Sequence, residues 1–142
     1  FRPSDWNALA TYDRPFFADD RGVFLRQWVQ SDQAPTRACF MAETEGTITG
    51  YGVIRACRQG FKIGPLFANS ETIAEALFLS MAEHAGVGET IILDVPEDNA
   101  AAIALAERHG LESVFETARM YRGTAPFLPI DRIFGITSFE LG

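Results

Sequence analysis

The residue types that most often bind metals or act as nucleophiles are few in this chain and stand apart from one another. Its two cysteines, Cys39 and Cys57, lack both CxxC spacing and a neighbouring pair of histidines. This pattern favours buried thiols over a zinc site or a disulfide. His84 and His109 occur singly near the ends of predicted helices, where the helix dipole favours an imidazole. We therefore expect no metal centre and no histidine-based catalysis.

Asp94 lies within a run of apolar residues that predicts a buried strand. Because removing a carboxylate from water is costly, Asp94 needs a cationic partner, which Arg55 or Arg119 could provide. The pattern favours a structural ion pair. Arg21 lies in an Asp-rich segment near the start of the chain, where it either lines the entrance for a ligand or is a solvated helix charge.

The elements that must position these residues alternate between the two hydrophobic periods. Residues 1–30 predict a short opening strand and helical pieces, with Ser4 or Asp5 as a helix cap. Apolar residues recur at helical spacing over 73–85, and the continuous apolar run 91–95 is typical of a strand buried on both faces. The other predicted elements are strands at 38–43, 48–56 and 61–67, a helix at 99–108, and late strands at 113–121 and 132–139.

This order predicts a mixed α/β (α+β) domain. The three consecutive strands are antiparallel, and the helix between 61–67 and 91–95 supplies one parallel crossover in a central, mostly antiparallel sheet flanked by helices. With 142 residues, 47% of them hydrophobic, the chain suits a single domain over 1–142. It begins at Phe1 rather than Met, which is compatible with its being the C-terminal part of a longer protein.

The composition argues against several classes of partner. The net charge is −7 and the basic residues are scattered singly, whereas nucleic-acid binding requires a concentrated Lys and Arg surface. No apolar run is long enough to predict a membrane span, and no basic-then-apolar leader predicts secretion. We expect a cytoplasmic location and small-molecule partners, with no nucleic acid and no membrane.

Short stretches in sequence order carry a resemblance to a known family. Segment 91–111, IILDVPEDNAAAIALAERHGL, resembles the strand–Asn–helix–Gly motif of GNAT proteins, the acyl-CoA-dependent N-acetyltransferases, with Asn99 and Gly110 on matching positions. More specifically, the chain is similar to the second half of tandem-GNAT bacterial acetyltransferases. That similarity is carried by IGPLFA at 63–68, LDVPEDN at 93–99, ARMYRG at 118–123 and SFELG at 138–142.

The resemblance implies a GNAT-like fold, acetyl-CoA as co-substrate and an amine of a small molecule as acyl acceptor. In this fold two parallel strands splay apart, here 63–68 and 90–95, and the pantetheine arm of acyl-CoA pairs with the exposed backbone of the first strand. The cofactor's pyrophosphate rests on the N-terminus of the following helix, whose unpaired N–H groups attract anions. The residues implied to bind the cofactor are Leu66, Phe67, Ala68, Asn69, Ser70 and Asn99.

The chemistry of the family needs a base for the amine proton and an acid for the leaving thiolate. Glu43, at the end of a strand near the expected cleft, is the candidate base, and Tyr121 in a late strand is the candidate acid. The candidates for contacting the substrate are Arg21, Arg55 and Arg119. Several of these residues have a structural alternative: Tyr121 as a half-buried sheet aromatic, and Asn99 or Ser70 as a plain helix cap.

Two departures from the family pattern separate membership from catalysis. The phosphate loop of the family is glycine-rich because only glycine lets the backbone approach phosphate closely, yet no glycine lies between Pro65 and Gly86. Glu71 adds a negative charge at the first helical turn, and Ala106 stands where the family places its proton-donating tyrosine. Three functions stay open. They are an active N-acetyltransferase domain, a weak or non-catalytic half that serves substrate binding or packs against a second GNAT domain, and an acyl-CoA or small-molecule sensing or dimerisation module, for instance as a homodimer.

Overall fold

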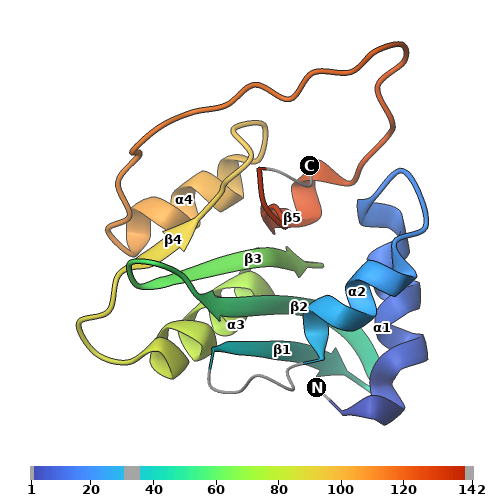
Figure 1. The fold of residues 1–142 in the computed structure, drawn as a ribbon, viewed down its shortest axis with the longest axis horizontal. Helices are drawn as coiled ribbons and strands as arrows, with labels where there is room; N and C mark the ends of the chain where they lie inside the picture. Colours follow the sequence, from blue (N-terminus) through green and yellow to red (C-terminus); the bar gives the residue numbers. More distant parts are fainter. Residues whose placement is uncertain (1, 31–35, 140–142) are drawn as a thin grey trace.

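The computed structural model describes residues 2–30 and 36–139, which form a sheet with helices around it (Figure 1). The first elements are the 3-10 turn η1 (Pro3–Asp5), helix α1 (Trp6–Asp13), the 3-10 turn η2 (Arg14–Phe16) and helix α2 (Gly22–Val29). The central elements are β1 (Arg37–Thr44), β2 (Thr47–Ala56), β3 (Phe61–Ala68), α3 (Glu71–Ala85), β4 (Ile91–Leu93) and α4 (Ala100–Arg108). The last are the 3-10 turn η3 (Ile130–Arg132) and β5 (Ile133–Gly135).

Turn and cap chemistry sets the boundaries of the central elements. The β1–β2 hairpin turns at Glu45 and Gly46, which both have positive φ, as a tight hairpin turn requires. Ser70 caps α3, because its Oγ accepts a hydrogen bond from the Ile73 N–H. Gly86, with a φ of 104°, ends the same helix. Sequence signals for turns and caps therefore identify these boundaries well.

The sheet has the order β1-β2-β3-β4 and is antiparallel except for the β3–β4 pair. β3 and β4 run parallel because α3 carries the chain back across the sheet between them. The predicted mixed, mostly antiparallel sheet with one parallel crossover is confirmed. β5 also pairs with β3, in antiparallel orientation. It lies on the same edge of β3 as β4 does, since β2 occupies the other edge.

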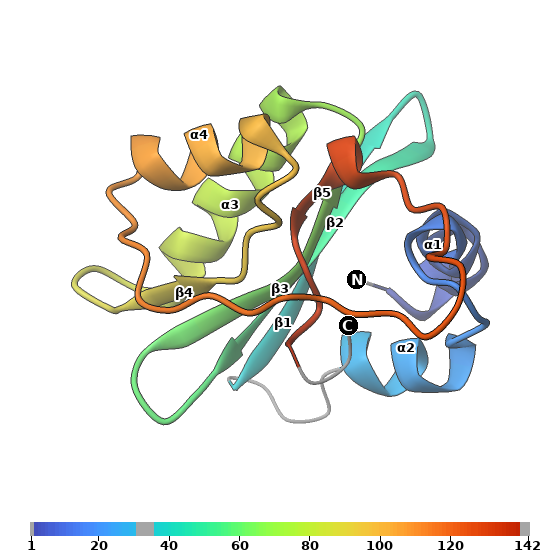
Figure 2. The ribbon, with the colours of Figure 1, turned by 90° about the horizontal axis from the view of Figure 1, so that it is seen from above.

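Two hydrophobic clusters cover the two faces of the sheet. Helices α3 and α4 pack on one face through Phe78, Met81 and Leu105. Helices α1 and α2 pack on the other face through Leu9 and Leu25. Figure 2 shows the two pairs of helices on opposite sides of the strands. The central strands β2 and β3 are covered from both sides, which explains their nearly continuous apolar sequences.

Two predicted strands are wrong and a third is shortened. The opening residues form 3-10 and α-helical turns, and no strand precedes β1 in the described residues. Residues 113–121 belong to an irregular segment, residues 112–129, which we call the arch. A strand-prone sequence forms a strand only beside a partner, and β4 offers just Ile91–Leu93 before the chain turns away. The last predicted strand, 132–139, is reduced to Ile133–Gly135.

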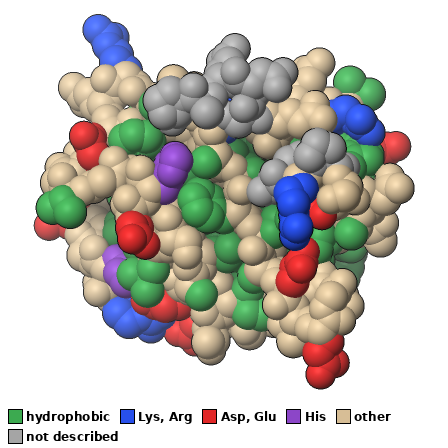
Figure 3. Space-filling model, turned by 90° about the horizontal axis from the view of Figure 1, so that it is seen from below, with side chains coloured by type: hydrophobic (Ala, Val, Ile, Leu, Met, Phe, Trp, Pro, Cys, Tyr) green, Lys and Arg blue, Asp and Glu red, His purple; other side chains and the backbone are tan. Residues whose placement is uncertain are grey.

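Two features concern possible partners: the distribution of charges on the surface and the length of the helices. Figure 3 shows one face of the molecule, on which acidic, basic and apolar side chains are interspersed. No helix within residues 2–30 and 36–139 is long and apolar enough to cross a bilayer.

Candidate functional site at the gap between β3 and β4

The parallel pairing of β3 and β4 is short, and the two strands separate after it. Their register joins Phe61 to Ile91, Lys62 to Ile92 and Ile63 to Leu93, and it ends there. β4 stops at Leu93, whereas β3 continues to Ala68. Beyond Ile63, the edge of β3 therefore faces a gap that β4 does not fill. This gap is the place that the family resemblance assigns to acyl-CoA.

The chain's own strand β5 occupies this gap. Leu66 pairs with Gly135, and Phe67 pairs with Ile133. The Ile136 N–H donates a hydrogen bond of 3.0 Å to the Asp94 carbonyl, which joins the end of β5 to the end of β4. β5 is therefore bonded to β3 on one side and to the residue that follows β4 on the other (Figure 1).

Two glycines let these backbones approach closely. A Cβ built on Gly64 would lie 2.5 Å from the Thr137 carbonyl oxygen and 2.7 Å from that of Ile136. A Cβ built on Gly135 would lie 2.5 Å from Cδ1 of Leu93. The atoms near Gly64 belong to the backbone, so only glycine permits that approach, whereas a side chain at Gly135 would require the end of the Leu93 side chain to move. The residues after β5 thus lie directly on the backbone of β3.

Hydrogen bonds from the Asn99 side chain hold the start of β5. Its Oδ1 accepts hydrogen bonds of 3.1 Å from the Ala101 and Ala102 N–H groups, so Asn99 caps α4. Its Nδ2 donates to the carbonyls of Ile130 and Ile133, both at 2.9 Å. The side chain is buried and its whole hydrogen-bonding capacity is used within the chain. In this structure Asn99 is the helix cap that the sequence offered as the alternative to a cofactor contact.

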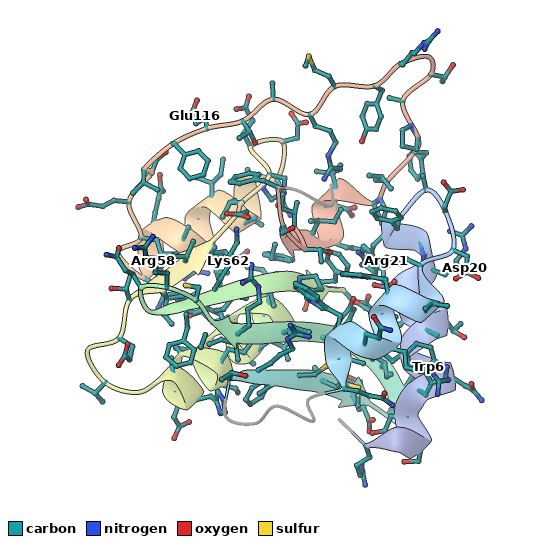
Figure 4. The ribbon with its side chains drawn as sticks, viewed as in Figure 1. Trp6, Asp20, Arg21, Arg58, Lys62 and Glu116 are labelled. Atoms are coloured by element: carbon teal, nitrogen blue, oxygen red, sulfur yellow. The ribbon has the colours of Figure 1, made fainter. Side chains whose placement is uncertain are left out.

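A buried charged cluster holds the residues after β5. Arg21, beside α2 in Figure 4, binds Asp13 through Nε at 2.9 Å and Nη2 at 2.6 Å. The Tyr51 hydroxyl donates to the same carboxylate at 2.5 Å. Nη1 of Arg21 donates to Oγ1 of Thr137 at 2.8 Å. The side chains of Arg21 and Asp13 are 8% and 3% exposed. The guanidinium that we expected to contact a substrate is thus occupied by groups of its own chain.

The protonation states of this cluster are set by burial and by the Asp13 carboxylate. Burial, and the adjacent negative charge, raise the pKa of Tyr51 well above its usual value, so the phenol stays a hydrogen-bond donor. Burial alone would lower the pKa of Arg21, but the hydrogen bond with Asp13 and the nearby charges outweigh it and the pKa is raised. Neither group exchanges a proton near neutral pH. The cluster therefore acts as a structural tie.

Asp94 finds its partner in Lys62, so the prediction of Arg55 or Arg119 was wrong. Nζ of Lys62 lies 2.5 Å from Oδ2 of Asp94, and both side chains are largely buried. The register explains this pairing, because Lys62 is opposite Ile92 and the residue two positions later projects from the same face of the sheet. The ion pair ties β3 to the end of β4 beside the gap.

The Asn69 side chain is engaged at the start of α3, where the resemblance places the pyrophosphate. Its Oδ1 accepts hydrogen bonds from the Tyr12 hydroxyl at 3.0 Å and from Nη2 of Arg132 at 2.6 Å. Glu71, whose charge we expected to repel phosphate, pairs with Arg108 of α4 at 3.2 Å. The negative charge at this end of the helix is therefore partly compensated.

Three further residues that the resemblance assigns to the cofactor point into the protein core. Leu66, Phe67 and Ala68 are buried. The ring of Phe67 stacks on that of Phe16, with ring centroids 4.2 Å apart. A ligand in the gap could therefore contact β3 only through its backbone. At Leu66 and Phe67 this backbone is already paired with β5.

The two candidate proton-transfer residues lie at opposite ends of the molecule. Glu43 is near the end of β1, the strand farthest from β4, and lines an open hollow of about 430 Å³ with Arg2 and Met41. Tyr121 lies on the arch, outside any strand and 45% exposed, and its hydroxyl accepts a hydrogen bond from Arg119 at 3.4 Å. β1 and the arch are at the bottom and top of Figure 1. The structure does not bring these two residues into one site.

Sequence reasoning missed several residues that shape the gap. Asp13 and Tyr51 are far apart in the chain, and nothing in their spacing marks them as partners. The Trp28 indole N–H donates to the Gly64 carbonyl at 3.0 Å, which occupies one more group of β3. The one available signal was Tyr51 itself, whose hydroxyl lies in the middle of a predicted buried strand and needs a partner there.

The cysteines and metal ligands add no further centre. Burial raises the pKa of the Cys39 thiol to about 12, so this thiol is a poor nucleophile at neutral pH. Within the part of the chain that the structure describes, no three His, Cys, Asp or Glu side chains are grouped to hold a metal ion.

A family model matches most of the chain. The model of the acetyltransferase (GNAT) domain matches residues 9–135, which include both strands of the gap, the helices α3 and α4, and β5. The chain belongs to the GNAT acetyltransferase family.

Among curated proteins, the chain is similar to the holothin acyltransferase of Pseudoalteromonas sp. (strain SANK 73390). The two are 27% identical over 131 residues. The alignment covers 92% of this chain and 44% of that protein. The chain therefore spans less than half the length of this relative.

Two solved structures share the fold. One is AAC(6')-Iy in complex with the bisubstrate analogue CoA-S-monomethyl-acetylneamine, with a TM-score of 0.64, 14% identity, and coverage of 88% of this chain and 95% of that chain. The other is the aminoglycoside acetyltransferase meta-AAC0020 from an uncultured soil metagenomic sample in complex with sisomicin, with a TM-score of 0.52, 13% identity and 82% coverage of both chains. At these identities the likeness concerns the fold alone.

Proposed function

We propose that this chain is one half of a longer N-acyltransferase that transfers an acetyl group from acetyl-CoA to an amine of a small molecule. In this proposal the present half binds acetyl-CoA weakly or not at all and serves to pack against a second GNAT domain and to shape the acceptor side. The observation that carries the proposal is the position of β5, which pairs with β3 at Leu66 and Phe67 in the gap expected for the cofactor. Family membership and the acyltransferase relative support the reaction class.

The backbone groups that would bind pantetheine do not fit the cofactor here. The Gly64 carbonyl accepts the Trp28 indole N–H, and the next ladder groups of β3 pair with β5. The carbonyls of Ile136 and Thr137 pack directly over Gly64. A ligand that paired with β3 would have to displace three sets of contacts at once. In this proposal the acyl transfer takes place outside this domain.

The loop before α3, where the resemblance places the pyrophosphate, supports the proposal less strongly than the gap does. The loop before α3 lacks the glycines that let backbone approach phosphate, and Oδ1 of Asn69 already accepts two hydrogen bonds. Glu71 argues less strongly against an anion than its charge suggests, because Arg108 neutralises part of it. The blocked gap, more than this loop, favours a half without its own cofactor.

Arg55 and Arg119 are the proposed contacts on the acceptor side, where a guanidinium would bind an oxygen of the acceptor rather than its amine. Within the described residues neither guanidinium pairs with a carboxylate. Arg55 lies 5.6 Å from the centroid of the Trp28 ring, and Arg119 lies exposed on the arch. One neighbour of the same fold is an aminoglycoside acetyltransferase in complex with sisomicin, which is consistent with a small molecule as the acceptor.

Isothermal titration of the purified chain with acetyl-CoA tests this proposal. We expect no saturable heat even at millimolar acetyl-CoA, because β5 stays in the gap. Saturable binding at micromolar concentrations would overturn the proposal. The Asn69→Gly, Glu71→Gly double variant separates the two possible causes of weak binding. If β5 is the obstacle, the added glycines restore no binding; if they do restore it, the phosphate loop was the obstacle.

The dimerisation alternative rests on a separate observation. The arch exposes large apolar side chains along much of its length, among them Val114 and Met120. Such a surface favours association of the chain with another protein surface.

A further inference from the structure

Three basic side chains form one row across the sheet, on the face that α1 and α2 cover. Arg37 of β1 is directly opposite Arg55 of β2, and Arg55 is directly opposite Lys62 of β3 (Lys62 is labelled in Figure 4). Residues directly opposite each other project from the same face, and Trp28 of α2 lies against both arginines. In a chain with a net charge of −7, the fold thus gathers basic residues that the sequence scatters.

Two charges of this row have no anionic partner within the described residues. The lysine is held by Asp94, whereas neither arginine forms an ion pair with a carboxylate. Arg37 donates to the carbonyls of Gln27 and Trp28 at 3.2 Å and 3.4 Å. Burial, and the nearby charge of Arg55, lower the pKa of Arg37. Like charges in facing positions destabilise a sheet, so this pair is unfavourable until an anion joins it.

The Trp28 ring holds both guanidinium groups close to one position. The Cζ atoms of Arg37 and Arg55 lie 4.6 Å and 5.6 Å from its centroid. The ring is itself fixed, because it stacks on Phe24 with centroids 5.1 Å apart and its Nε1–H donates to the Gly64 carbonyl at 3.0 Å. A guanidinium that packs on an aromatic ring still presents N–H donors at its edge. The two arginines therefore lose little side-chain freedom when they bind a ligand.

We propose that Arg37 and Arg55 together bind the carboxylate or phosphate group of a small molecule. Guanidinium N–H groups match the spacing of the oxygens in both kinds of anion and bind them through charge-assisted hydrogen bonds. One anion between the two arginines replaces their repulsion with two attractions. The net charge of −7 disfavours a polyanion, so the ligand is a small molecule.

The row of basic residues ends beside the gap between β3 and β4. Lys62 is opposite Ile92, and the ladder of the two strands ends one residue later, at Ile63 and Leu93. The next step rests on the proposed function, which puts the acyl acceptor on this side of the domain. The acceptor is then a small molecule that carries an acidic group besides its amine.

The chain contains its own control for anion binding. Cζ of Arg26 lies 4.3 Å from the centroid of the Trp6 ring, so the second tryptophan of the chain is also beside a guanidinium. Arg26 belongs to helix α2 and has no basic residue in a facing strand position. Weak attraction of salt to any arginine would therefore affect both tryptophans, whereas a site built from two facing arginines affects Trp28.

Nuclear magnetic resonance of the two indole Nε1–H groups tests the site. The purified chain is titrated with sodium acetate and, separately, with sodium phosphate, at constant ionic strength. We expect at least one of the two salts to shift the Trp28 signal saturably and to leave the Trp6 signal nearly unchanged. The Trp6→Phe variant identifies the signals, and the salt that saturates identifies the anion. Shifts of both signals that never saturate would overturn the proposal.

Matched arginine variants test which side chains bind the anion. The Arg55 guanidinium has no hydrogen bond to a described residue, so Arg55→Gln should keep the fold, which circular dichroism checks. We expect its affinity for the anion to fall about tenfold or more, because charge-assisted hydrogen bonds are lost. Arg26→Gln should leave the affinity unchanged. Equal affinities of the two variants would contradict the assignment of Arg55.

Urea denaturation gives a second measurement that does not use the indole signals. The salt that saturates the Trp28 signal should raise the urea midpoint of the wild type more than that of Arg55→Gln, because a ligand stabilises the fold that binds it. Equal increases would mean that the salt acts without this site. Neither experiment contains acetyl-CoA. Saturable acetyl-CoA binding in the calorimetric titration would therefore overturn the proposed function and leave the anion site standing.

Discussion

The segments around β5 and along the arch come from one continuous stretch of sequence, yet they differ in almost every structural respect. β5 is buried and paired with β3, the Asn99 side chain holds its start, and Arg21 holds Thr137 just after it. Residues 112–125 are exposed throughout and carry no backbone hydrogen bond to another element among the described residues. Both segments predict strands from sequence.

This contrast teaches that the free edge of a partner strand decides where a strand forms. β3 has an edge that β4 abandons after Ile63, and a nearby segment with Gly135 can approach it closely. β4 is a short strand, and Pro96 follows soon after its end. Residues 113–121 have an intrinsic preference for strand, but they form none because no partner strand is there to hydrogen-bond with them.

The largest effect should come from removing the charge that holds the residues after β5. Arg21→Met leaves the Asp13 carboxylate buried with the Tyr51 hydroxyl as its remaining donor. We expect a loss of about 3–5 kcal/mol in the free energy of unfolding, measured by urea denaturation. Arg58→Met, at an exposed position, is the control and should change stability by less than about 0.5 kcal/mol. Equal losses would mean that the cluster does not stabilise the fold.

A smaller loss of stability is expected when the hydrogen bonds from the Asn99 side chain at the start of β5 are removed. Asn99→Ala removes the cap of α4 and leaves the carbonyls of Ile130 and Ile133 without a donor. The expected loss is about 2–4 kcal/mol, whereas Ser70→Ala, which removes the cap of α3, should cost about 1 kcal/mol. Asn99→Asp keeps the cap and removes the donor. If Asn99→Asp is as stable as the wild type, the hydrogen bonds that Nδ2 of Asn99 donates do not stabilise the fold.

The close approach at Gly64 gives a third way to disturb the region of β5. Gly64→Ala places a methyl group 2.5 Å from the Thr137 carbonyl, so the backbone of that segment must shift. We expect a loss of about 1–3 kcal/mol. Ala118→Val adds volume on the exposed arch and should be neutral in the monomer. Unchanged denaturation of Gly64→Ala would mean that the segment after β5 moves away without cost.

The smallest effect should appear at the end of α4, where the arch departs. Burial alone would raise the pKa of Glu75, but hydrogen bonds with Arg108 and His109 outweigh it and the pKa is lowered. A carboxylate with a lowered folded pKa stabilises the fold above its unfolded pKa of about 4.3, and this stability is lost as the pH falls through the folded value. The urea midpoints of wild type and Glu75→Gln should therefore differ slightly at about pH 7 and converge at about pH 3. Glu107→Gln, at an exposed position of α4, is the control and should change the midpoint at about pH 7 less than Glu75→Gln does.

Much of the fold could be predicted because local signals were strong. The helical spacing of Leu77 and Met81, the cap at Ser70 and the hairpin turn at Glu45 and Gly46 each act over a few residues. The parallel crossover followed from the order of the elements alone. These are features that neighbouring residues determine among themselves.

The candidate site could be predicted much less well. The sequence resemblance led to the gap beside β3, but it did not indicate that β5 would occupy this gap. The residue types suggested an arginine for Asp94, where the ladder register brings Lys62. The sequence placed Arg21 at a ligand entrance or on a solvated helix surface, whereas Asp13 and Thr137 bind it. Each of these outcomes depends on partners that are distant in the chain.

The sequence by itself determined the class of this protein: most of its helices and strands, their order, and its membership of the GNAT family. The tertiary structure alone decided which late segment became a strand, which carboxylate met which cation, and how the edge of β3 is covered. The physical reason is the range of the interactions. Helical periods, caps and turns are set within a few residues, whereas ladder pairing and buried ion pairs depend on chain folding that brings distant residues together.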